Sequence, residues 1–162
     1  NSLTCIVRKG EFSPCPNIEA NIVPLEGSPQ GVIVADGSVP YLGIGILREN
    51  IRLNVKDGFI ISVEGGEQAE TLKAAWEAQG DPNSYNIAEL GIGLNPKARM
   101  TGVMLEDEGV YGSVHIGTGT SINLGGKIKA SSHYDLLLWN PTLILDDEPL
   151  LVDGKVAEGI AP

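Results

Sequence analysis

The sequence is poor in cysteine and in aromatic residues, and both shortages narrow the class of protein. Cys5 and Cys15 are the two cysteines among 162 residues. A disulfide-rich scaffold is therefore excluded, and we expect two reduced thiols in a cytoplasmic protein. Aromatic residues make up 5% of the chain, whereas glycine occurs 21 times. This composition indicates many tight turns between short strands.

Basic residues are also scarce. Eleven Lys and Arg stand against 21 Asp and Glu, which gives a formal net charge of -10. Because binding to phosphates requires clustered cations, we expect no nucleic-acid partner. No apolar run approaches the roughly 20 residues that a membrane-spanning helix needs, so we expect no membrane partner.

The length suits one domain with a single hydrophobic core, and we treat residues 1–162 as that domain. Because the chain starts at Asn1 rather than at Met, we expect it to be the C-terminal fragment of a longer protein. The predicted elements give an α+β fold that is dominated by strands and has two main helices.

The clearest strands form a hairpin. Ile51, Leu53 and Val55 alternate with polar residues, and Asp57-Gly58 then supplies a turn before residues 59–63. Residues 31–35 predict a buried strand.

Two segments have helical spacing. Residues 67–79 carry an apolar face and stop at Gly80, a residue that commonly ends helices. Residues 96–108 follow Asn95, a good N-cap, and predict the second helix. The acidic run at 106–108 is interpreted as the solvated end of that helix.

The two histidines are the most informative residues. His115 and His133 both lie in strand-like sequence, and Asp135 follows His133 by two positions. Alternate residues of a strand share a face, so His133 and Asp135 could converge on one cation. The alternative is a half-buried strand end at which His133 is hydrogen bonded to a neighbour.

Two glutamates stand among apolar residues. Glu19 and Glu89 interrupt apolar and glycine-rich runs, where an unpaired carboxylate loses hydration at a cost. Each could instead point to water from an edge strand. One account covers all five residues: Glu19, Glu89, His115, His133 and Asp135 would bind one or two divalent metals. A set without thiolates suits Zn²⁺, Co²⁺, Mn²⁺ or Fe²⁺.

Four stretches then resemble a known family in order and spacing. They are IEANIVP (18–24), NIAELGIGLN (86–95), EDEGVYGSVHIG (106–117), and LGG (124–126) followed by HYD (133–135). Across residues 15–145 the chain resembles the catalytic C-terminal portion of the thermophilic leucyl aminopeptidase (aminopeptidase T) family of metallopeptidases. The resemblance implies a two-metal centre held by the five residues above, with Glu19 or Glu89 also acting in proton transfer.

The chain departs from that family at several positions. Ile18 replaces a Gly, no Tyr occurs in residues 118–123, and Ile128 and Ala130 stand where the family has Asn and Ser. These changes are compatible with metal binding but count against peptidase activity.

Three functions are consistent with these observations. The leading expectation is an aminopeptidase-like hydrolase that uses Zn, Co or Mn to activate water. The second follows from a related resemblance to 2,5-dihydroxypyridine 5,6-dioxygenase: a ring-cleaving Fe(II) enzyme in which His115, His133 and Asp135 bind the iron. The third is a degenerate, non-catalytic domain for binding or assembly. For either enzyme we expect a small peptide or another small molecule as substrate, and a homodimer.

Overall fold

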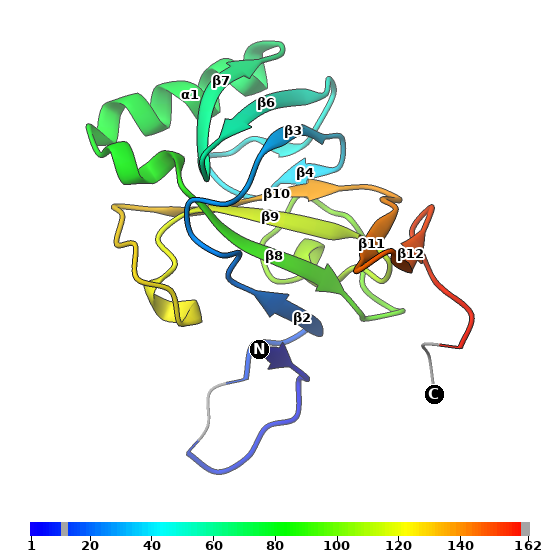
Figure 1. The fold of residues 1–162 in the computed structure, drawn as a ribbon. Helices are drawn as coiled ribbons and strands as arrows, with labels where there is room; N and C mark the ends of the chain where they lie inside the picture. Colours follow the sequence, from blue (N-terminus) through cyan, green and yellow to red (C-terminus); the bar gives the residue numbers. More distant parts are fainter. Residues whose placement is uncertain (11–12, 160–162) are drawn as a thin grey trace.

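Figure 1 shows the computed structural model of the protein, which describes residues 1–10 and 13–159. Its largest sheet has five strands in the order β1-β2-β8-β9-β10, and every neighbouring pair is antiparallel. The strands are β1 (Ser2–Leu3), β2 (Glu19–Ile22), β8 (Ile87–Gly93), β9 (Val114–Gly119) and β10 (His133–Leu138).

A second sheet contains β3 (Gly31–Ala35), β6 (Ile51–Lys56) and β7 (Phe59–Glu64). The predicted hairpin is confirmed: Asp57 and Gly58 both have positive φ, as a tight two-residue turn requires. The prediction of a buried strand at 31–35 is only half right. The strand forms, but it lies at the edge of its sheet and only its last residue is buried.

The single α-helix, α1 (Glu67–Gln79), has the predicted bounds and ends at Gly80 in a left-handed conformation. Its side chains Ala69, Leu72 and Trp76 are buried against the second sheet and against Leu136 of β10. Figure 1 shows this helix beside β6 and β7, above the large sheet. The hydrophobic core therefore lies on one face of the large sheet and leaves the other face for polar side chains.

The predicted second helix at 96–108 is wrong. The segment forms turns, and only the short 3-10 helix η2 (Asp107–Gly109) is helical. The Asp107 carboxylate accepts hydrogen bonds from the backbone N–H groups of Thr101 (2.7 Å) and Gly102 (2.8 Å), and these bonds compete with helix formation. Positive φ at Gly102 and Leu105 breaks the helix further. The fold is accordingly α+β, as predicted, but with one α-helix instead of two.

The remaining elements are short. They are β4 (Ser38–Val39) paired with β5 (Gly45–Ile46), the sheet of β11 (Leu143–Leu145), β12 (Glu148–Val152) and β13 (Lys155–Val156), and the 3-10 helices η1 (Pro82–Tyr85) and η3 (Ile122–Leu124). Within the described residues, none of the helices has both the length and the apolar character to cross a bilayer.

Candidate metal centre

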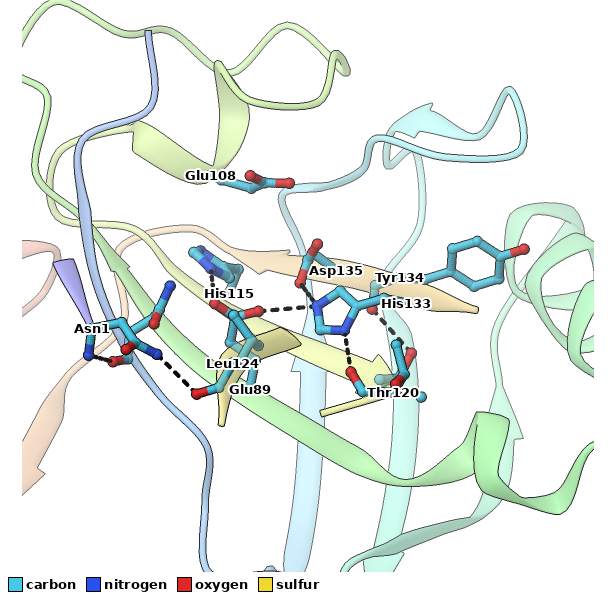
Figure 2. A network of polar contacts seen from close by, with 12 residues as sticks. Asn1, Glu89, Glu108, His115, Thr120, Leu124, His133, Tyr134 and Asp135 are labelled. Atoms are coloured by element: carbon cyan, nitrogen blue, oxygen red, sulfur yellow. Dashed lines mark hydrogen bonds and ion pairs between the residues drawn. The ribbon is translucent and has the colours of Figure 1, made fainter. Parts of the chain in front are cut away.

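The five predicted site residues project from one face of the large sheet. Glu89 of β8 and Asp135 of β10 both pair with Gly117 of β9, which lies between them. His115 is two residues before Gly117, and His133 is two residues before Asp135, so both imidazoles share that face. Figure 2 shows Glu89, His115, His133 and Asp135 gathered on this face.

Glycines leave the space that these side chains occupy. A Cβ atom at Gly91, opposite His115, would lie 2.0 Å from His115 Nε2. A Cβ atom at Gly117 would lie 2.7 Å from both Glu89 Cβ and His133 Nε2. Any larger residue would displace the polar groups, so the glycines of these strands are part of the site.

The polar atoms form two clusters that share Glu89. His133 Nε2 lies 3.0 Å from Glu89 Oε2 and 3.3 Å from Asp135 Oδ1. His115 Nε2 lies 3.3 Å from Glu19 Oε2 and 3.6 Å from Glu89 Oε1. Within each cluster, Glu89–His133–Asp135 and Glu19–Glu89–His115, one atom from every residue lies within 4.8 Å of the others. Either cluster could hold a metal ion.

Further polar residues hold the carboxylates in place. Asn17 Nδ2 donates to Glu19 Oε2 and to Glu108 Oε2, both at 3.1 Å. Asn21 Nδ2 donates to Glu19 Oε1 at 2.6 Å. The Tyr41 hydroxyl donates to Asp135 Oδ2 at 2.6 Å and lies 3.3 Å from Glu108 Oε1. Asn17 and Tyr41 thus connect the two clusters through Glu108.

A hydrogen bond on the side of the ring away from the carboxylates fixes the orientation of His133. Its Nδ1 donates to the carbonyl oxygen of Thr120 at 2.8 Å, which leaves Nε2 directed at the carboxylates (Figure 2). A backbone carbonyl on the distal ring nitrogen is the usual support of a metal-binding histidine. With its imidazole nitrogens, carboxylate oxygens and absence of thiolates among the described clusters, this set fits a divalent transition metal.

The charges of the cluster are strongly coupled. Burial disfavours the cation of His133, but its bonds to Asp135 and Glu89 outweigh burial and raise its pKa to about 11. For His115 the bond to Glu89 and the charge of Asp135 likewise overcome burial, and the pKa rises to about 9. Each imidazole is therefore surrounded by negative charge. The same carboxylates would attract a metal cation.

The carboxylates fall into two groups, one with lowered and one with raised pKa values. Burial opposes ionisation of Asp135, yet the hydrogen bond from His133 lowers its pKa to about 2. The bonds from His115 and His133 similarly lower the pKa of Glu89 against the effect of burial. Burial prevails at Glu19, whose pKa is raised. Burial and the charge of Asp135 raise the pKa of Glu108 to about 8.

Several of these residues were not predicted from the sequence. Glu108 was assigned to a solvated helix end, but the structure buries it beside the site. The one signal was that an acidic run opposes the dipole at the C-terminus of the expected helix. Tyr41 comes from the loop between β4 and β5, far from residues 118–123, where the resemblance requires a Tyr. No sequence pattern pointed to Asn17 or Tyr41.

The site opens into a pocket of about 580 Å³. All five predicted residues line it, together with Asn17, Asn21, Tyr41, Glu108 and Thr120. Pockets of about 300–1,000 Å³ are typical of small-molecule sites. The two clusters therefore face a space that a small substrate could enter.

The comparisons with known proteins favour one chemistry. The model of the 2,5-dihydroxypyridine 5,6-dioxygenase (NicX) family matches residues 4–158. A 2,5-dihydroxypyridine 5,6-dioxygenase of Pseudomonas putida KT2440 is 34% identical over 143 residues, which are 82% of this chain and 41% of that protein. The solved structure of 2,5-dihydroxypyridine dioxygenase from Pseudomonas putida KT2440 has a TM-score of 0.78 at 30% identity, over 86% of this chain and 43% of that one.

A structure of wild-type AmpT from Thermus thermophilus also superposes, with a TM-score of 0.66 over 86% of this chain and 39% of that one. At 18% identity this similarity shows a shared fold and no more. This chain spans about two fifths of the length of the Pseudomonas relatives.

These findings correct the leading expectation from the sequence. The resemblance to aminopeptidase T holds for the fold, but the hydrolase and aminopeptidase assignment is wrong. Both the family match and the relative at 34% identity are dioxygenases. The matches support the second expectation, which rested on the resemblance to 2,5-dihydroxypyridine 5,6-dioxygenase. The chain belongs to the 2,5-dihydroxypyridine 5,6-dioxygenase family.

Proposed function

We propose that this protein is an iron-dependent dioxygenase that opens the ring of a hydroxylated pyridine. The observation that carries the proposal is the Glu89–His133–Asp135 cluster at the pocket, in a chain of this family. Non-haem Fe(II) oxygenases typically hold the metal with two histidines and one carboxylate and leave other positions open for oxygen and substrate. The cluster here offers the same ligand types, as one histidine and two carboxylates.

The geometry favours a ligand set different from the one expected for an oxygenase. His115, His133 and Asp135 were expected to bind iron, but the ligand atoms converge in two other sets, Glu89–His133–Asp135 and Glu19–Glu89–His115, and only the first contains two of the three expected ligands. His115 reaches this set only through Glu89. We therefore assign iron to Glu89, His133 and Asp135. Glu19 and His115 are then available for proton transfer.

Ferrous iron, when bound, would supply the electron exchange that allows molecular oxygen to react with an aromatic ring. The chain's own residues prepare the site. Tyr41 orients Asp135 through its hydroxyl, and Thr120 orients His133 through its carbonyl. His115 Nε2, 3.3 Å from Glu19 Oε2, forms an acid–base pair that can hold the proton released when a ring hydroxyl ionises.

The experiment combines metal analysis with turnover. The protein is purified and loaded with Fe(II) without oxygen, and its iron content is measured. It is then mixed with 2,5-dihydroxypyridine under ¹⁸O₂. We expect one iron per chain, consumption of oxygen, and a ring-opened product with two labelled oxygen atoms. Iron binding without ring opening, or a product labelled from water instead, would contradict the proposal.

A further inference from the structure

The loop between β9 and β10, residues 120–132, supplies both a wall of the pocket and a support of the metal centre. Asn123 and Leu124, on the short helix η3, line the pocket. The carbonyl oxygen of Thr120, at the start of the loop, accepts the hydrogen bond from His133 Nδ1 (Figure 2). Both features depend on where this loop lies, so a residue that holds the loop also holds the site.

Glu26 holds the first arm of this loop, residues 120–128. It lies in the connection between β2 and β3 and is not among the described residues that line the pocket. Its Oε1 atom accepts hydrogen bonds from Ser121 Oγ at 2.8 Å and from the backbone N–H groups of Lys127 at 2.7 Å and Ile128 at 3.0 Å. Bonds to a carboxylate are stronger than bonds between neutral groups, so this single oxygen ties both ends of the arm together.

The second arm, residues 129–132, is attached at a different place. Asp81 Oδ2 accepts hydrogen bonds from the backbone N–H of Ser131 at 2.8 Å and from its hydroxyl at 2.9 Å. This attachment does not include Thr120. Glu26, in contrast, bonds the residue that directly follows Thr120 in the chain.

We propose that Glu26 is a positioning residue, which holds the first arm of the β9–β10 loop so that the Thr120 carbonyl keeps His133 Nε2 directed at the metal centre. Glu26 touches no reacting group and acts through Thr120. The role of His133 as an iron ligand rests on the proposed function, whereas the attachment of the loop does not. Residues that orient a metal ligand in this way affect the affinity for the metal without contacting it.

The chain has two histidines, so labelling with ¹⁵N-histidine gives an NMR spectrum with two imidazoles, which His115→Gln assigns. In the metal-free protein, exchange of the His133 Nδ1 proton with water reports on the bond to Thr120. His115 Nδ1 has no hydrogen-bond partner among the described residues and serves as the internal reference. We expect Glu26→Ala to speed exchange at His133 Nδ1 at least about tenfold, by local opening, and to leave His115 unchanged.

Two further variants separate positioning from a general loss of stability. Glu26→Gln keeps an acceptor oxygen at the same place, so it should restore most of the protection that Glu26→Ala loses. Ile60→Val shortens a buried side chain of β7 in the hydrophobic core, on the face of the large sheet opposite the site. It should lower stability and leave exchange at His133 as in the wild type.

Ferrous iron gives a second readout. Fe(II) is titrated into each variant without oxygen, and its dissociation constant is measured. We expect a several-fold rise for Glu26→Ala, below the roughly 10–100-fold effect of losing a direct partner of a metal ligand, because Glu26 acts one step further away. Glu26→Gln should lie between Glu26→Ala and the wild type.

Unchanged exchange at His133 in Glu26→Ala would overturn the inference, and so would an equal increase in Ile60→Val. Equal effects of Glu26→Ala and Glu26→Gln would also count against it, because the acceptor oxygen would then have no role. Faster exchange with unchanged affinity for Fe(II) would remove the link to the metal centre. A wild-type protein that binds iron and opens no ring would contradict the dioxygenase reaction and leave the role of Glu26 standing.

Discussion

Gly91 lies directly opposite His115 in the β8–β9 pair, and the imidazole occupies the space that a side chain at position 91 would fill. The same relation holds between Gly117 and the neighbouring pair Glu89 and His133. Glycine normally weakens a strand, because it increases the conformational entropy of the unfolded backbone and has no side chain that could pack. Here the glycines allow five polar side chains to stand on one face of a sheet.

Gly91→Ala is the direct test of this relation. The added methyl group must move His115, and overpacking of this kind costs about 1–3 kcal/mol of unfolding free energy. We expect lower stability in urea and weaker metal binding. Gly27→Ala is the control, because Gly27 has a positive φ but nothing within 4 Å of its Cβ position. Backbone strain alone should leave metal binding unchanged there, and normal binding by Gly91→Ala would contradict the argument.

The two clusters make different predictions for glutamate variants. If iron is held by Glu89, His133 and Asp135, then Glu89→Gln should lose nearly all bound iron. Glu19→Gln should retain it, because Glu19 belongs only to the other cluster. The measurement is iron content after anaerobic dialysis. Equal loss in the two variants would show that the ion lies in the Glu19–Glu89–His115 cluster or bridges both.

Tyr41→Phe removes the hydroxyl that donates to Asp135 and keeps the aromatic ring. Leaving a buried carboxylate without this donor costs about 1–3 kcal/mol, and loss of a residue that orients a metal ligand typically weakens metal binding about 10–100-fold. Tyr134→Phe is a matched control, because its hydroxyl accepts from Gln79 and touches no site carboxylate. If both variants weaken metal binding equally, Tyr41 does not act through Asp135.

Glu26 gives a pH-dependent prediction away from the metal cluster. Hydrogen bonds from the backbone of Lys127, the Ser121 hydroxyl and the backbone of Ile128 lower its pKa below the ordinary value of 4.5. Because the folded pKa is the lower one, the stabilisation is complete above pH 4.5 and is lost as the pH falls through the folded value. Glu26→Gln should therefore be less stable than the wild type at pH 7, by a margin that shrinks toward pH 3. A margin that does not vary with pH in urea unfolding would refute this assignment.

The sequence predicted the histidines and carboxylates that gather at the pocket better than the residues that hold them in place. His133 and Asp135 follow from strand alternation alone, and Glu89 stands out because an apolar run rarely contains an unpaired carboxylate. Asn17 and Tyr41 carry no such signal, since an amide or a phenol in a loop fits many environments. Their roles depend on tertiary contacts with Glu108, which is 91 positions from Asn17.

The error at 96–108 has a similar origin. Asn95 does accept the backbone N–H of Lys97, as an N-cap would, but it closes a turn and begins no helix. The Asp107 carboxylate then binds Thr101 and Gly102, and neither contact follows from helical periodicity. The single-domain assignment, the longer parent protein, the homodimer and the cytoplasmic location stay predictions.

Strand β10 carries the site on one side and the core on the other. Asp135 faces the carboxylate cluster, whereas the next residue, Leu136, is fully buried against Trp76 and its neighbours. A change of volume at Leu136 that tilts the strand would therefore displace Asp135 as well. A substitution at Leu136 is therefore a test of both properties, because a shift of β10 would alter the stability of the core and the position of the Asp135 carboxylate together.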